Sequence, residues 1–300
     1  MRSLQGLQNI DRVSFHRTVK SRLPLLSFIL AATVLFIASY HETLVWMYGR
    51  YISSESYYSH GFLVPFVTAY FIWRKRDQLR DEPAGVSWWG LALIAAALLI
   101  HVFGTVIYVF SVSGISIFIL IFGLSLFLAG SRITRIILFP LAFTIFMFPL
   151  PSAIISVISF PLKLFVAKSG AWIAGLTGIP VYLEGFYISI PAGTLLVGNP
   201  CSGLRSLITF LALGSILAYI SPLSLWKRVS ILLVSVPVAI ASNVVRVPVL
   251  IIISHYRGLE AAMPGGFWHD GSGIMVFVIV FVLLICFTRI LEWGAPEKNT

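Results

Sequence analysis

The chain has 300 residues, of which 58% are hydrophobic and only 11% are charged, a composition that excludes a soluble globular protein. Its 21 Lys and Arg residues outnumber its 11 Asp and Glu residues. No basic tract with interleaved aromatic residues lies outside the apolar runs, so we expect no nucleic-acid partner. In a membrane protein such a basic excess belongs to the loops, where it fixes the orientation.

Residues 1–24 form a polar, basic segment followed by the first long apolar run, 25–46. No small-residue cleavage site ends this run, which predicts a retained signal-anchor helix and a cytoplasmic tail over 1–24. Seven further apolar runs are read as spans, because a helix of about 20 apolar residues crosses the hydrocarbon layer. They are 61–73 with a few flanking residues, 88–110, 114–129, 136–150, 203–220, 231–253 and 271–287.

These runs predict an all-α polytopic membrane protein with about eight transmembrane helices, in which 25–290 form a single integral membrane domain and 291–300 a cytoplasmic tail. Placing both termini inside puts fifteen of the 21 Lys and Arg residues in cytoplasmic segments and four outside. This asymmetry supports an N-in, C-in topology.

Residues 152–202 are expected to lie on the outer side. The stretch 152–178 is apolar but carries Pro161, Lys163 and Lys168, and a full crossing would put Lys227 and Arg228 outside. It is therefore read as an interfacial or re-entrant helix. Short β-prone pieces punctuated by Gly and Pro follow over 179–198 and predict a small extracytoplasmic β-hairpin cap.

The motif Asn199-Pro200-Cys201-Ser202 resembles a helix start, with Asn199 as the N-cap and Pro200 in the first turn. A thiol in that turn is favoured as a thiolate by the helix dipole. Arg205, four residues on, would share its face. The sequence therefore proposes Cys201 as a nucleophile, although packing is the common role of a lone membrane cysteine.

Arg246 lies inside an apolar run, where a charged side chain costs at least about 2.5–3.5 kcal/mol and indicates a functional site. Asn243, three residues earlier, lies on the same helical face and is positioned to orient the guanidinium. His269 opens the last span, next to Asp270, which could orient the imidazole. Under the predicted topology Cys201, Arg246 and His269 share one depth at the outer side, as acyl transfer with a cysteine nucleophile requires.

Simpler roles remain open for several of these residues. Arg205 could extend its side chain to the water interface, and Arg246 could be a structural ion-pair partner. His60 is the best substitute base, because other histidines also fall near the outer face. No histidine spacing indicates a metal site, and we expect no metal and no cofactor.

Several blocks resemble the exosortase/archaeosortase family. They are Cys201-Ser202-Gly203-Leu204-Arg205-Ser206-Leu207, Asn243-Val244-Val245-Arg246, His269 and the earlier Tyr58-Ser59-His60-Gly61-Phe62-Leu63-Val64-Pro65. The resemblance implies a cysteine transpeptidase of the bacterial envelope, with Cys201 as nucleophile and Arg246 and His269 as catalytic partners. It implies an inner-membrane enzyme with an extracytoplasmic active site. Its protein substrates would carry a C-terminal Pro-Glu-Pro-type motif, a hydrophobic helix and a basic tail.

Two other functions stay open. A transporter or flippase for an anionic lipid-linked sugar would use Arg205 and Arg246 along its substrate path, but it predicts inverted repeats that the sequence does not display. An intramembrane peptidase would hydrolyse the intermediate that a transpeptidase passes to an acceptor. The residues do not identify that acceptor, for which a lipid- or glycan-linked amine is the expectation.

Overall fold

The computed structural model describes residues 2–53, 56–198, 203–263 and 265–293, with side chains from residue 26 onward. By internal contacts the chain divides into two units, 1–46 and 47–300. The first unit consists of most of a single long helix, α1 (Arg2–Ile52), so the segment predicted as a polar tail is helical too. The second unit holds all the other elements and all the residues of the site.

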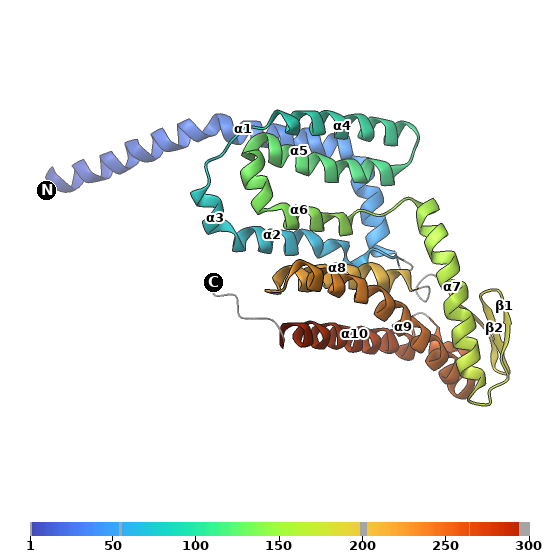
Figure 1. Ribbon diagram of the computed structural model, residues 1–300. Coiled ribbons are helices and arrows are strands. Elements are labelled where there is room, and N and C mark those ends of the chain that lie inside the picture. Colours follow the sequence, from blue (N-terminus) through green and yellow to red (C-terminus); the bar gives the residue numbers. More distant parts are fainter. Residues whose placement is uncertain (1, 54–55, 199–202, 264, 294–300) are drawn as a thin grey trace. The chain divides into compact units, whose positions relative to one another are not determined.

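The second unit is mainly helical (Figure 1). Its elements in chain order are η1 (Ser59–Phe62), α2 (Val64–Arg74), α3 (Arg76–Asp81), α4 (Trp88–Val106), α5 (Phe110–Ile136), α6 (Leu138–Phe143), η2 (Thr144–Met147), α7 (Ser152–Gly175), β1 (Tyr182–Glu184), β2 (Tyr187–Ile190), β3 (Gly193–Leu196), α8 (Leu204–Ile220), α9 (Leu225–Arg257), η4 (Leu259–Ala262) and α10 (Phe267–Trp293).

The predicted class, an all-α polytopic membrane protein, is confirmed. Within the described residues six helical segments are long and apolar enough to cross a membrane: Leu26–Ile52, Trp88–Val106, Phe110–Ile136, Ser152–Gly175, Leu225–Arg257 and Leu259–Trp293. The protein is therefore a multi-pass membrane protein. Large apolar side chains such as Leu99, Val157 and Leu233 face outward from these helices, as lipid contact allows.

The span-by-span map differs from the prediction where the sequence expects full spans at 61–73, 136–150 and 203–220. The structure has shorter helices in these places, namely the 11-residue α2, α6 followed by η2, and the 17-residue α8. At 1.5 Å per residue, 11 residues extend about 16 Å, half of the hydrocarbon thickness. Buried Val64, Phe143 and Ala212 pack α2, α6 and α8 together, so these short helices are held by one another.

Helix α7 is one continuous 24-residue helix despite Pro161 in its interior. It is long enough to cross a membrane. In Figure 1, however, it runs across the direction that α4, α5, α8 and α10 share. That orientation is the one expected of a helix lying along the interface, and the interfacial role stays a prediction.

The predicted β pieces form a three-stranded antiparallel sheet in the order β1-β2-β3, one strand more than the expected hairpin. Gly185 in the β1–β2 turn and Gly193 at the start of β3 have positive φ angles of 60° and 131°, where L side chains would be strained. Strand β2 alternates in burial, and its Ile188 and Ile190 point to the core.

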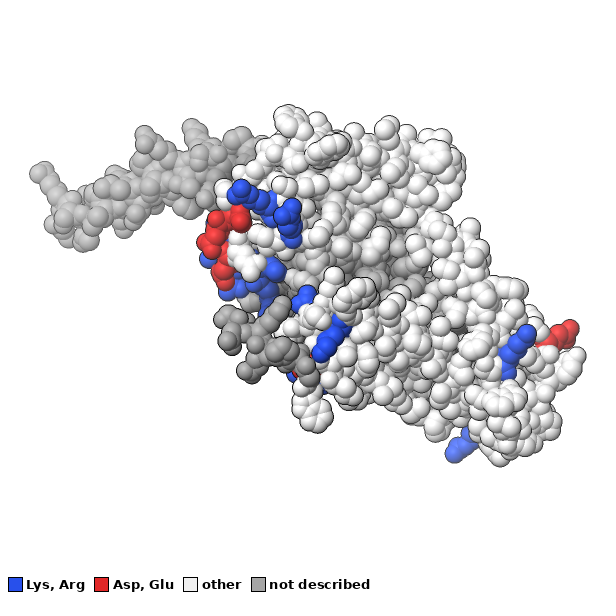
Figure 2. Space-filling model, in the orientation of Figure 1, with Lys and Arg blue, Asp and Glu red and all other residues white. Residues whose placement is uncertain are grey.

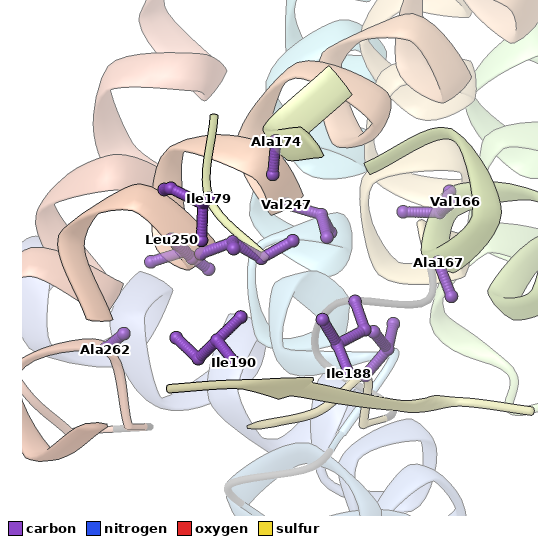
Figure 3. Packing of buried hydrophobic residues seen from close by; sticks show 11 residues of the cluster. Val166, Ala167, Ala174, Ile179, Ile188, Ile190, Val247, Leu250 and Ala262 are labelled. Carbon is purple, nitrogen blue, oxygen red and sulfur yellow. The ribbon is translucent and has the colours of Figure 1, made fainter. Parts of the chain in front are cut away.

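A buried apolar cluster joins the sheet and α7 to α9 (Figure 3). Ile188 and Ile190 of β2 meet Val166 and Ala167 of α7 and Val247 of α9 there. A Cβ atom on Gly170 of α7 would lie 2.5 Å from Cγ1 of Val247, so only glycine permits this approach of the helices. The cluster fixes the part of α9 that carries Arg246.

A second cluster packs α8, α9 and α10 through buried Phe210, Ala239, Val276, Val280 and Leu284.

On the face in Figure 2 the charged residues gather at two ends, with a broad uncharged band between them. The end where α3, α5 and α10 terminate carries the larger share of the described Lys and Arg residues, namely Arg74, Lys75, Arg76, Arg80, Arg132, Arg135, Lys227, Arg228 and Arg289.

Candidate active site

Arg246 on α9 contacts the first turn of α10. Its Nη2 donates to the backbone carbonyl of His269 at 3.0 Å and lies 3.5 Å from His269 Nε2. Its Nε donates to Ser272 Oγ at 3.3 Å, and that hydroxyl in turn donates to the His269 carbonyl at 2.8 Å. The structure thus brings together the arginine and the histidine that the sequence singles out, and one guanidinium spans the turn that carries the imidazole.

His269 is 5% exposed and its Nδ1 lies 3.0 Å from Oδ1 of Asp270. Because an ionised carboxylate only accepts hydrogen bonds, Nδ1 carries the proton in this pair. When the imidazole is neutral, Nε2, on the side of Arg246, is then the ring nitrogen that can accept a proton. Asp270 itself is largely exposed, with a side chain 61% open to solvent, so it orients the ring from the solvent side.

Helix α8 begins at Leu204, and its N-cap residue Gly203 has a left-handed backbone with φ 84°. A helix running from Pro200 through Arg205 is therefore wrong, because Gly203 interrupts it, and the argument that Cys201 and Arg205 share one helical face does not hold. Asn199, Pro200, Cys201 and Ser202 lie outside the described residues, so their predicted roles stay predictions.

Arg205, in the first turn of α8, donates from Nε to the backbone carbonyl of Ser56. It therefore fixes α8 against the segment that leads into η1. In the same region His60 Nδ1 lies 3.4 Å from Thr209 Oγ1, one helical turn after Arg205. Burial lowers the pKa of His60; the carbonyl of Phe146 opposes that shift and the charge of Arg205 adds to it.

A cavity of about 330 Å³ is lined by Arg205, Arg246 and His269 together. Three helices supply its polar wall, and the residues involved are Arg205, Ser206, Thr209, Asn243, Arg246, His269 and Asp270. Phe210, Ile274, Val276 and Phe277 supply the apolar wall. Gly273 lies against Arg246, since a Cβ there would stand 3.2 Å from Nη2. Of the predicted site residues within the described chain, only His60 is absent from this lining.

Asn243 is 1% exposed, and neither its Oδ1 nor its Nδ2 has a hydrogen-bond partner. The expectation that its amide orients the guanidinium is therefore wrong, because Arg246 bonds to α10 instead. Asn243 faces Gly203: a Cβ on that glycine would lie 2.5 Å from Asn243 Nδ2. The amide is thus packed against the chain next to the cysteine motif.

A second cavity, of about 400 Å³, lies where α7 meets the segment that follows α1. Cationic Arg50 and Lys163 line it, together with Tyr57, Tyr58 and hydroxyls of Ser53, Ser56, Ser152, Ser156 and Ser159. Ser56 connects the two sites, because it lines this cavity and its backbone carbonyl accepts a hydrogen bond from Arg205. Lys168, the other lysine of α7, is not among the lining residues.

Ser56, Thr209, Ser272 and Gly273 contribute to the site without having been singled out in the sequence. The spacing of Ser272, three residues after His269 on a helix, would have indicated a shared face. Nothing in the sequence pairs Ser56 with Arg205, which lies 149 positions away. No group of three His, Cys, Asp or Glu residues that would hold a metal occurs in the described part of the chain.

A sequence profile of the transmembrane exosortase family matches residues 52–286, which include every residue of the two cavities but Arg50. Neither a search of curated proteins nor a search of solved structures found a match. Because the profile covers more than half of the chain, this multi-pass membrane protein belongs to the transmembrane exosortase family.

Proposed function

We propose that the protein is a membrane-embedded cysteine transpeptidase or peptidase that removes the C-terminal sorting signal of envelope proteins through a thioester on Cys201. The observation that carries this proposal is the contact between Arg246 and His269 in a cavity that Arg205 also lines. Cys201 precedes Gly203 by two residues, and two residues of chain span at most about 7 Å. Covalent geometry thus leaves the thiol within reach of the cavity.

The residues divide the reaction among them. The Cys201 thiol gives its proton to Nε2 of His269, and the thiolate attacks the scissile carbonyl carbon. The carbonyl oxygen becomes an oxyanion near the charge of Arg246, whose Nη1 bonds to no described residue. When the C–N bond breaks, the leaving amine takes the proton from His269 and the thioester remains.

The second half of the reaction resolves the thioester. An acceptor amine gives a proton to His269 and attacks the thioester carbonyl, after which the thiolate leaves. If water enters instead, the product is a free carboxylate. We place this site at the extracytoplasmic face of the inner membrane, because the opposite end of the helices carries nine of the fifteen Lys and Arg residues whose side chains the structure describes.

We assign the substrate's acidic recognition motif to the second cavity. Arg50 and Lys163 give it positive charge, and its serine hydroxyls and two tyrosines offer hydrogen bonds. Ser56 connects it to the catalytic cavity through Arg205. A substrate anchored by its own transmembrane helix would hold such a motif at the membrane surface and leave its basic tail inside.

The test is a reporter protein that ends in a Pro-Glu-Pro-type motif, a hydrophobic helix and a basic tail, expressed together with the full chain. Cys201→Ala should leave it unprocessed while the variant still accumulates in the membrane. Cys286→Ala is the matched control, since Cys286 is an exposed residue of α10 and should not matter. Normal processing by Cys201→Ala would refute the proposal.

Mass spectrometry of the processed reporter then separates the two modes of resolution. A free C-terminal carboxylate indicates hydrolysis, and an added mass at that terminus identifies an acceptor. If Cys201→Ala were silent while neutralising Arg246 abolished a transport activity, the flippase alternative would replace the proposal.

A further inference from the structure

The unpartnered amide of Asn243 is the feature of the site that the mechanism above leaves unused. Within the described chain it is the one buried side chain whose hydrogen-bonding atoms, donor and acceptor alike, both lack a partner. A buried polar group without a partner costs about 1–3 kcal/mol. A leucine of similar size would avoid that cost, so packing alone does not account for an asparagine here.

The surroundings of Asn243 indicate which group its amide would bind. Its side chain lines the catalytic cavity beside Arg205 and Arg246. Its Nδ2 is also the atom nearest to a Cβ built on Gly203, so the amide lies next to the backbone two residues after the nucleophile. The terminal torsion angle of an asparagine side chain varies at little energetic cost. A rotation about it would turn the Nδ2–H toward the cavity.

We infer that Asn243 donates an Nδ2–H hydrogen bond to the oxyanion that forms on the substrate carbonyl when the thiolate of residue 201 attacks it. The inference rests on the proposed function, and it makes Asn243 a catalytic residue. Arg246 has two of its donor groups committed to the carbonyl of His269 and to Ser272. Arg246 therefore holds the histidine and offers its charge and its remaining Nη1 to the oxyanion, while the amide of Asn243 adds a second donor.

Two reactions of one thiol test the inference without the natural substrate. Iodoacetamide alkylates a thiolate by displacement at a saturated carbon, so no oxyanion forms. A p-nitrophenyl ester acylates it: the C–S bond forms, an oxyanion arises on the carbonyl, and p-nitrophenolate leaves as the C–O bond breaks. Only the second reaction benefits from an oxyanion donor.

Both rates would be measured on the full chain in detergent, in a Cys286→Ser background where residue 201 is the single cysteine. Asn243→Leu, which keeps the volume and lacks the donor, should slow acylation by about 10²–10³-fold and leave alkylation within about twofold. Asn243→Ala should have the same effect on both rates. Because alanine is smaller than asparagine, this variant shows that the effect does not come from a steric clash of the leucine. Ser242→Ala is the matched control, because among the described residues that hydroxyl bonds to the Ala239 carbonyl in its own helix and to nothing else.

An equal fall in both rates would overturn the inference, because Asn243 would then act on the thiol or on the fold. Unchanged acylation would overturn it as well. If the wild-type chain leaves the reporter unprocessed while Asn243→Leu loses acylation alone, the substrate assignment fails and the oxyanion donor stands. If Cys201→Ala takes up the ester as fast as wild type, the nucleophile and the donor role both fail.

Discussion

The site contains two pairs of histidine and arginine that differ in how they are joined. Arg246 bonds directly to the turn that carries His269, and Asp270 lies against the far nitrogen of the ring. Arg205 and His60 are linked through other residues: Arg205 donates to the Ser56 carbonyl, and His60 Nδ1 approaches Thr209 Oγ1. The first arrangement fixes a tautomer and a basic nitrogen, whereas the second joins two segments of chain.

This contrast teaches that residue type alone does not assign the base. The sequence offers His60 as a substitute for His269, and the structure places both near an arginine. The difference is the carboxylate, since Asp270 orients His269 and no described Asp or Glu bonds to His60. We therefore propose proton transfer for His269 and a positioning role for His60.

The largest expected effect comes from replacing each of the two histidines and comparing the loss of processing. His269→Ala should lower reporter processing by about 10²–10⁴-fold, the usual contribution of a general acid–base group. His60→Ala should cost about tenfold or less, because it removes one long contact to Thr209 of hydrogen-bond strength. Initial rates of processing at matched membrane levels would measure both. A larger loss in His60→Ala than in His269→Ala would reverse the assignment.

The next effect concerns the two arginines. Arg246→Lys keeps the charge, but an ammonium cannot reach the His269 carbonyl and Ser272 at once as the guanidinium fork does. Losing a hydrogen bond from a charged group costs about 1.5–3 kcal/mol, which corresponds to roughly a 10–150-fold loss of processing. The matched control is Arg289→Lys, whose exposed arginine pairs with Glu292 at the distant end of α10. A fully active Arg246→Lys would show that only charge matters.

Ser272→Ala should have a smaller effect. It removes one acceptor from Arg246 while leaving the stronger bond to the His269 carbonyl in place. A single hydrogen bond of this kind contributes about 0.5–1.5 kcal/mol, so processing should fall by no more than about tenfold. A loss as large as that of His269→Ala would mean that Ser272 takes part in the chemistry itself.

The membrane class and the convergence of Arg246 and His269 could be predicted from the sequence, because hydropathy and the cost of a buried charge are local signals. The lengths of α2 and α6 could not, since apolar runs do not reveal where a short helix stops against its neighbours. The left-handed Gly203 defeated the helix-start argument at Pro200, because glycine at that position satisfies both a helix interior and a cap. The Ser56–Arg205 bond depends on tertiary contact alone.

The smallest effect is a pH dependence of stability that distinguishes the two histidines. Burial lowers the pKa of His60 in the folded protein below its usual value of about 6.5. Below that value the unfolded chain binds a proton that the folded chain refuses, so stability declines as the pH falls toward the folded pKa and is retained above about 6.5. His60→Gln should remove this part of the acid sensitivity, so its thermal midpoint in detergent should drop less between pH 7 and 5 than that of wild type. An identical drop in both proteins would show that the imidazole of His60 is as easily protonated in the fold as in the unfolded chain, and that Arg205 and burial do not act on it.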